Sequence, residues 1–188
     1  SNDLYFVCIS LAMAKRVTIL EEKLVNYRKS SGSLQANNAN SPWDWYEALK
    51  AVRTKLMELG IYEDVEYSYK NYVLDVSFYN LESMGNAQVF SMVYEKIKKE
   101  IFKEFGMEEL KKEEINSWNE KYYEQYLQLK ASGEKEYLFY RIKELKKENQ
   151  YWMERARKAE QDTKNNIIYI TARNIWIMAR RILRKKGN

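Results

Sequence analysis

Hydrophobic residues recur at helical spacing over most of the chain and predict a mainly α-helical protein. Residues 3–29 are predicted to form a first helix: apolar residues from Met13 to Tyr27 repeat by four and three positions with charged residues between them, and residues 4–11 are apolar nearly all round. Residues 41–60 begin with Ser-Pro-Trp-Asp and end at Gly60, residue types that favour a helix start and a helix stop. Two further apolar stripes predict helices over residues 86–105 and 108–130.

One segment departs from helical spacing and predicts a small antiparallel β-hairpin at about residues 62–80. Apolar and polar side chains alternate in residues 65–69 and 72–79, with a two-residue loop between them. Directly opposed residues of a hairpin share a face, so this register makes one face apolar and the other polar. The expected fold is therefore mainly α with one hairpin (α+β), in a helical body over residues 1–131.

Two polar stretches predict how the chain is organised. Residues 30–40 (SSGSLQANNAN) are small and polar and cannot bury enough apolar surface to offset the entropy of ordering, so we expect a flexible loop. Ser132 and Gly133 interrupt the helical pattern and separate the body from residues 134–188. We expect this last segment to form a long, basic C-terminal helical arm.

The first half of the arm carries a heptad seam, in which residues alternate at steps of four and three. The seam residues predicted to mediate oligomerisation are Leu138, Ile142, Leu145, Asn149 and Trp152. An Asn at a core position of a coiled coil costs stability but fixes register and two-strand pairing. The seam therefore predicts a homodimeric coiled coil, with packing of the same seam on the chain's own helices as the alternative.

Composition and charge favour a helical protein whose arm meets an acidic partner. The 188 residues include one proline and six glycines, so helix breakers are few. Residues 141–188 contain fourteen Lys or Arg and five Asp or Glu, a formal charge of +9. Because the whole chain carries +5, residues 1–140 carry −4. A weakly acidic body with a basic arm indicates an acidic partner for the arm.

The end of the arm is the predicted nucleic-acid-binding segment. From Lys164 onward no acidic residue occurs, and basic residues oppose an apolar arc on the helical wheel. The residues expected to contact the phosphates of DNA or RNA are Arg173, Arg180, Arg181, Arg184, Lys185 and Lys186. Arginine forks match phosphate oxygens, and such binding is salt-dependent and not base-specific. A protein partner, a membrane surface and a solvated tail without a ligand are the alternatives.

The residue types argue against catalysis. The chain has no histidine and a single cysteine, Cys8, which excludes an intramolecular disulfide, a cysteine metal cluster and a Ser-His or Cys-His pair within one chain. The glycines form no phosphate-binding loop. Glu66 and Asp75 share the polar face of the predicted hairpin, where a two-carboxylate Mg²⁺ site competes with a plain solvated face. We expect no enzyme activity, metal or cofactor.

These features predict a small, non-enzymatic, nucleic-acid-associated accessory protein of the cytoplasm that self-associates through its helices. Residues 4–14 are apolar but reach only about two-thirds of the length that spans a bilayer. The competing prediction is a structural or inhibitory protein–protein interaction protein, of mobile-element or phage type, whose basic face is incidental. Salt distinguishes the two, because phosphate binding weakens with ionic strength and apolar assembly does not.

Overall fold

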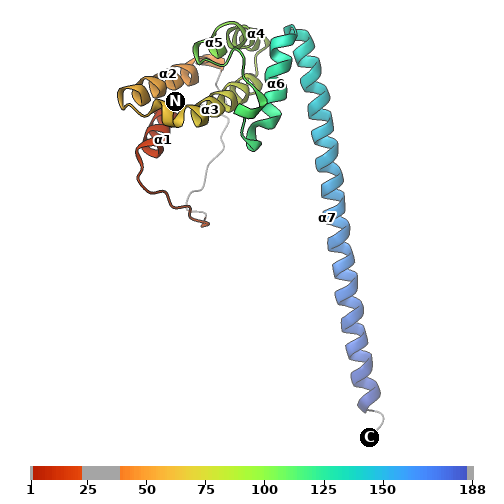
Figure 1. Ribbon diagram of the computed structural model, residues 1–188. Coiled ribbons are helices and arrows are strands. Elements are labelled where there is room, and N and C mark those ends of the chain that lie inside the picture. The colour runs from red at the N-terminus through yellow and green to blue at the C-terminus, as the bar shows by residue number, and fades with distance from the viewer. Residues whose placement is uncertain (1, 23–38, 186–188) are drawn as a thin grey trace. The chain divides into compact units, whose positions relative to one another are not determined.

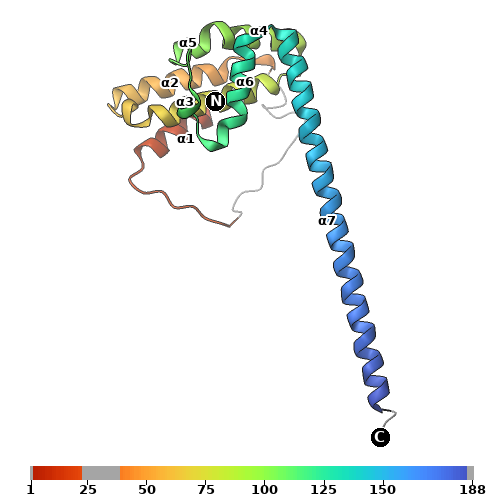
Figure 2. The ribbon, with the colours of Figure 1, turned by 45° about the vertical axis from the view of Figure 1, so that its right-hand side comes forward.

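The fold is helical in a computed structural model (Figures 1 and 2) that describes the backbone of residues 2–22 and 39–185, with the side chains of residues 3–22 and 39–171. No strand occurs within these described residues. The chain divides into two units, Ser1–Tyr137 and Leu138–Asn188. The first unit is a bundle of helices with its own core, and the second consists of the greater part of one long helix.

The main helices follow one another with short connections. In chain order they are α1 (Asn2–Met13), α2 (Asp44–Glu58), α3 (Tyr62–Glu82), α4 (Ala87–Lys96), α5 (Phe102–Glu104), α6 (Glu120–Ala131) and α7 (Glu134–Lys185). A π-helical turn, η2 (Ile97–Ile101), joins α4 to α5, and two 3₁₀ turns, η3 (Lys112–Glu114) and η4 (Ser117–Asn119), precede α6.

The predicted β-hairpin is wrong, because residues 62–80 lie within the single helix α3. This helix packs against α2, α4 and α6, so its side chains are buried on more than one face and the 3.6-residue period is hidden. The tyrosines and valines of this segment favour strands only weakly, and packing overrides such propensities. The mainly α part of the predicted fold is confirmed.

The core of the first unit is rich in aromatic rings. Phe78 of α3 stacks on Tyr122 of α6 with ring centres 5.9 Å apart, and Phe105 meets Tyr46 and Tyr69 edge to face at 6.0 and 5.9 Å. Such rings bury large apolar areas and add a preference for tilted or offset geometry. The largest fully buried side chains are Tyr94, Tyr126, Tyr137, Phe78, Phe105, Leu49, Leu74, Leu81, Ile97, Ile101, Met107 and Leu129.

The first helix is shorter than predicted. Helix α1 ends at Met13, and residues 16–20 are not helical. Val17, Thr18 and Ile19 are consecutive β-branched residues, which lose side-chain freedom in a helix and so lower its stability. The later positions of the predicted helix, and nearly all of the predicted flexible loop at residues 30–40, lie outside the described residues.

Helix α2 agrees with the prediction except at its start. It begins at Asp44, after the Ser-Pro turn, and its capping residue Trp43 makes no side-chain cap bond. Gly60 follows the helix with a φ of 67°, a left-handed conformation that glycine adopts without steric cost. The predicted helix stop at Gly60 is therefore confirmed.

The helix predicted over residues 86–105 is present, but it contains a π-helical turn. Asn86 caps its start by accepting hydrogen bonds from the main-chain N–H groups of Gln88 and Val89, at 2.9 and 3.1 Å. The apolar residues of this helix follow one another at intervals of four positions. Because an α-helix has 3.6 residues per turn, each such interval moves the side chain about 40° around the helix axis. The wider turn at Ile97–Ile101 reverses this drift, so the stripe stays on the core.

The helix predicted over residues 108–130 begins twelve residues late, at Glu120. The preceding residues form short 3₁₀ turns that Asn71 of α3 holds in place. Its side-chain amide donates to the carbonyl oxygen of Glu114, and its side-chain oxygen accepts from the N–H of Asn116, both at 2.9 Å. The main chain here is therefore bound to a buried side chain instead of to its own helix.

Candidate functional site

Helix α7 supplies the residues that the sequence assigns to binding, and its first turn is anchored in the core of the first unit. Ser91 of α4 donates a hydrogen bond to the carboxylate of Glu134 at 2.8 Å. The ring of Tyr137 is fully buried, lies 5.5 Å from that of Tyr94, and its hydroxyl donates to the side-chain oxygen of Gln125 at 3.3 Å. The helix then continues without interruption to Lys185.

The five seam residues all lie on this one helix. Because they alternate at steps of four and three, they form a single stripe along it. The exposed fractions of the apolar members are large: Leu138 36%, Ile142 49%, Leu145 51% and Trp152 59%. Asn149 is exposed between them. An apolar stripe of this kind is unusual on a helix that meets only water, where polar residues are expected all round.

The aromatic cluster at the end of the seam is organised by local contacts. The rings of Tyr151 and Trp152 meet edge to face at 5.4 Å, and the guanidinium of Arg155 lies 5.5 Å from the Trp152 ring. Arg155 also donates to the Tyr151 hydroxyl at 3.3 Å. These contacts orient the aromatic side chains, and both rings remain more than half exposed.

The predicted phosphate-binding residues continue the same helix. Arg173, Arg180, Arg181, Arg184 and Lys185 are on its helical backbone, and Lys186 lies outside the described residues. The side chains beyond residue 171 are also outside the described part. For these basic residues the structure therefore gives only their spacing along the helix. Immediately before them, four consecutive apolar residues, 167–170, are between 54 and 67% exposed.

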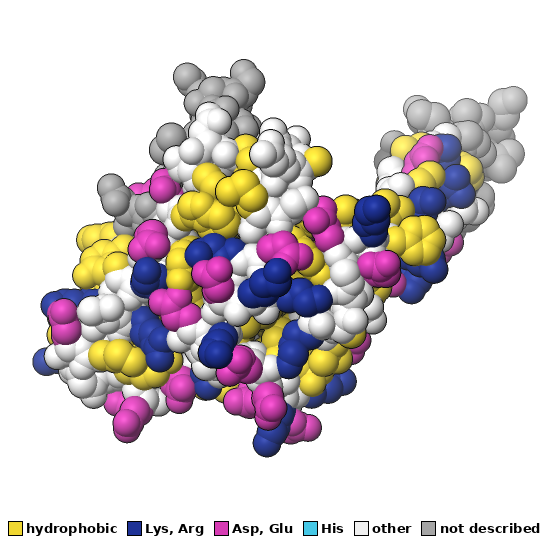
Figure 3. All heavy atoms as spheres, turned by 90° about the horizontal axis from the view of Figure 1, so that it is seen from above, with side chains coloured by type: hydrophobic (Ala, Val, Ile, Leu, Met, Phe, Trp, Pro, Cys, Tyr) yellow, Lys and Arg dark blue, Asp and Glu magenta, His cyan; other side chains and the backbone are white. Residues whose placement is uncertain are grey.

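The first unit carries a second exposed apolar surface, on helix α1. One side of this helix packs on the core through Leu4, Cys8 and Ile9. On its other side Phe6 is 70% exposed and Leu11 is 56% exposed. The charged side chains elsewhere on this unit are mixed: in the face drawn in Figure 3, basic and acidic groups alternate, with hydrophobic groups between them. That face of the unit offers no continuous basic surface for a nucleic acid.

The two-carboxylate metal site considered from the sequence is not formed. Glu66 and Asp75 are nine residues apart on helix α3, which places them on roughly opposite sides of it, and Glu66 pairs with Lys70 at 3.1 Å. Within the described residues no three or more His, Cys, Asp or Glu side chains gather into a possible metal site. No helix in that part of the chain is long and apolar enough to cross a membrane.

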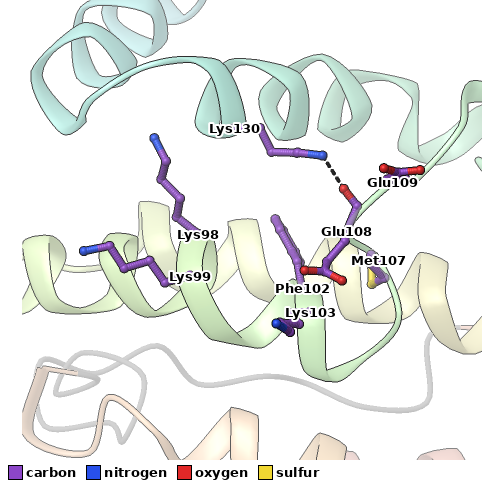
Figure 4. A pocket seen from close by; sticks show the side chains of 8 residues that line it. All are labelled: Lys98, Lys99, Phe102, Lys103, Met107, Glu108, Glu109 and Lys130. Atoms are coloured by element: carbon purple, nitrogen blue, oxygen red, sulfur yellow. Dashed lines mark hydrogen bonds between the residues drawn. The ribbon is translucent and has the colours of Figure 1, made fainter.

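The structure also contains a basic pocket that the sequence did not lead us to expect. Its lining residues are Lys98, Lys99, Phe102, Lys103, Met107, Glu108, Glu109 and Lys130, around a cavity of about 380 Å³. Figure 4 shows these side chains on η2, α5, the loop after α5 and α6, with Lys130 donating to the main-chain carbonyl oxygen of Glu108. The one available signal was the lysine-rich run KIKKEIFKEF; it is typical of a solvated helix face.

Comparisons with protein-family models, with curated proteins and with solved structures gave no match.

Proposed function

We propose that this protein is a non-enzymatic interaction protein that assembles with a second copy of itself by pairing the seams of two α7 helices. The observation that carries the proposal is the exposure of Leu138, Ile142, Leu145 and Trp152 along one uninterrupted helix. The exposed side of α1 supports an assembly function in general, because it gives the first unit an apolar surface of its own.

The free-energy gain from covering the seam is large enough to drive association. Helices in proteins derive most of their stability from packing an apolar face. Complete burial of a Leu or Ile side chain contributes about 1.5 to 3 kcal/mol, and pairing two copies buries each seam residue twice. Part of this gain offsets the entropy lost on association, so we expect a reversible dimer.

The identities of the seam residues favour a second copy of the chain as the partner. The four-and-three alternation assigns Ile142 and Asn149 to heptad position a, and Leu138, Leu145 and Trp152 to position d. Ile at a with Leu at d favours two parallel strands. In that arrangement Asn149 meets Asn149 of the other copy, where the two amides hydrogen-bond to each other and fix the register.

The same alternation limits the length of the paired region. Continued along α7, it reaches Ile170 and then assigns Arg173, Arg180 and Arg184 to core positions. In a parallel pair these arginines would face their own copies, and like charges held together repel. Pairing should therefore end before Arg173 and leave two arginine-rich ends close to each other.

Light scattering of the full chain tests the assembly proposal. We expect a concentration-dependent mass that rises from one chain to two. Ile142→Asp together with Leu145→Asp should return the mass to one chain, because a carboxylate in a paired seam is buried without a partner. Gln150→Asp, which adds one carboxylate on another side of α7, is the control and should leave pairing unchanged.

The assembly proposal has a clear contrary outcome. A mass of one chain at every concentration would overturn it. So would a double seam variant that dimerises as well as the Gln150→Asp control. Circular dichroism of each variant checks that the helices of the first unit are retained.

A second candidate function is binding of a nucleic-acid phosphate backbone by the arginine-rich end of α7. One observation favours it specifically: residues 164–188 contain no acidic residue, while the helix extends to Lys185. Pairing of α7 would strengthen this binding by placing two such ends side by side, since each neutralised phosphate releases counterions.

Fluorescence anisotropy of labelled duplex DNA, single-stranded DNA and RNA tests this second function. We expect affinity to fall steeply between low and moderate salt, with a slope that becomes shallower by about 0.9 for each phosphate contact removed. Arg180→Glu with Arg184→Glu should abolish binding, whereas Lys143→Glu, near the start of the same helix, should not. Absence of binding at low salt, or equal binding by the double variant, would eliminate nucleic acid as the partner.

A further inference from the structure

The basic pocket of the first unit is built from two layers of the bundle. Lys98 and Lys99 come from the π-helical turn η2, Lys103 from α5, and Lys130 from α6. Glu108 and Glu109, on the loop after α5, are the only carboxylates in the lining. The lining has four ammonium groups and two carboxylates around a cavity of about 380 Å³. Because Lys99 is also paired with Glu95 at 2.6 Å, counting that carboxylate leaves a formal charge of +1. This excess of like charge favours an anion over a metal ion.

Two of the lysines are held in position by main-chain carbonyl oxygens. The ammonium of Lys98 donates to the carbonyl of Ser132, and that of Lys130 donates to the carbonyl of Glu108, as Figure 4 shows for Lys130. A carbonyl does not neutralise an ammonium group. Each ammonium has three donors, so two remain on each lysine for a ligand. The two positive groups are thereby oriented without being paired with a carboxylate.

The π-helical turn is an independent sign of a site. Such turns are rare and are found often at functional positions, because they interrupt the regular hydrogen bonding of a helix. Here the turn contains Lys98 and Lys99 and leads directly into Phe102. It therefore forms one wall of the pocket.

The inner part of the pocket is apolar. Phe102 is 3% exposed and Met107 is fully buried, and both line the cavity. Pockets for small molecules combine such an apolar wall with a few polar groups that fix the ligand, and they begin at volumes of about 300 Å³. An anionic group held by lysines, with a small organic group against Phe102, fits this combination.

We propose that this pocket binds a small phosphate monoester. Its phosphate group lies between the ammonium groups of Lys98, Lys103 and Lys130, and its organic group contacts Phe102 and Met107. The three terminal oxygens of a phosphate monoester can accept hydrogen bonds from several ammonium groups at once. A carboxylate has only two oxygens and accepts fewer. The carboxylate of Glu108 faces the same space, opposes the ligand's charge and limits its affinity. This site is separate from the proposed function of α7.

Isothermal titration calorimetry of the full chain with phenyl phosphate, inorganic phosphate and benzoate tests the site. We expect saturable binding of phenyl phosphate, weaker binding of inorganic phosphate, and little binding of benzoate. Lys98→Gln with Lys103→Gln should weaken phenyl phosphate binding by about tenfold or more. Glu108→Gln should strengthen it, because a repelling charge is removed. The control Lys112→Gln, an exposed lysine that does not line the pocket, should have no effect.

The variants also separate this site from the arginine-rich end of α7 and from loss of folding. Arg180→Glu with Arg184→Glu should leave phenyl phosphate binding unchanged, and Lys103→Arg, which keeps the charge, should preserve it. Equal binding by the Lys98→Gln, Lys103→Gln variant and the wild type, or no saturable binding by the wild type, would overturn the proposal. Tighter binding in Glu108→Gln cannot come from unfolding, so that variant tests the pocket even if a lysine variant is destabilised.

Discussion

The side-chain amide of Asn119 donates a hydrogen bond to the main-chain carbonyl oxygen of Asn71 across 2.7 Å, and both side chains are more than nine-tenths buried. The Asn71 side chain in turn binds the main chain of Glu114 and Asn116. The Asn71 side chain thus binds a carbonyl and an N–H of the irregular segment before α6, and the Asn119 amide adds a bond to the main chain of α3. They attach the irregular segment before α6 to the middle of α3.

Replacement of Asn71 by Leu should destabilise the first unit by about 1 to 3 kcal/mol, because a carbonyl and an N–H are left partly buried without these partners. Urea unfolding followed by circular dichroism measures the change. Asn80→Leu is the control: Asn80 lies on the same helix and donates only to the Val76 carbonyl of its own helix, so about 1 kcal/mol or less is expected. If the two variants lose equal free energy of unfolding, the Asn71 contacts with the segment before α6 do not stabilise the first unit.

The hydroxyl of Tyr126 joins the loop after α5 to helix α6. It accepts from the N–H of Leu110 at 3.1 Å and lies 2.8 Å from the carbonyl oxygens of Met107 and Glu108. Tyr126→Phe keeps the buried ring and removes only these bonds, so a loss of about 1 to 3 kcal/mol is expected. Tyr123→Phe, on the adjacent partly buried ring, should change the urea midpoint little. The hypothesis fails if Tyr126→Phe is as stable as the wild type.

The sequence predicted helices correctly where one face is buried and the other is solvated, as in α2 and in the segment from Ala87 to Glu104. It failed at α3, because a helix buried on several sides has apolar residues at almost any spacing, including the alternation of a strand. The late start of α6 was also hidden, since it depends on Asn71, a residue about forty positions away in the sequence. Long-range side-chain contacts of this kind leave no local pattern.

The candidate binding residues were predictable to different degrees. The seam of α7 could be recognised because a heptad needs only local spacing, and the structure places all five seam residues on one helix. The basic pocket could not, because its lysines come from η2, α5 and α6 and meet only when the bundle packs. Each of those lysines alone is indistinguishable from an ordinary surface charge.

The stability of the first unit should decrease at alkaline pH through Tyr72. Burial, together with the neighbouring Cys8 thiol, raises the pKa of the Tyr72 hydroxyl to about 12 from its usual 10.0. Burial likewise raises the pKa of Tyr46 and Tyr69. Because the folded state holds the Tyr72 proton more tightly than the unfolded chain, the contribution of Tyr72 is complete below pH 10 and is lost as pH rises from about 10 to about 12.

Urea midpoints measured at several pH values from 8 to about 11 check this dependence. The wild type should lose stability above pH 10, and Tyr72→Phe, which has no proton to lose at that position, should lose it less steeply. Parallel declines in the two proteins would contradict the assignment to Tyr72.

Asn149 offers the sharpest test of how α7 pairs. A buried amide costs stability in a coiled coil but specifies register and strand number. Asn149→Ile should therefore tighten self-association by about tenfold or more, while allowing trimers or shifted registers beside the dimer. Analytical ultracentrifugation measures both effects. Asn165→Ile, the same replacement off the seam of the same helix, should alter neither affinity nor stoichiometry. If Asn149→Ile behaves like that control, Asn149 does not lie in a paired seam, and the partner of α7 must contact another side of the helix.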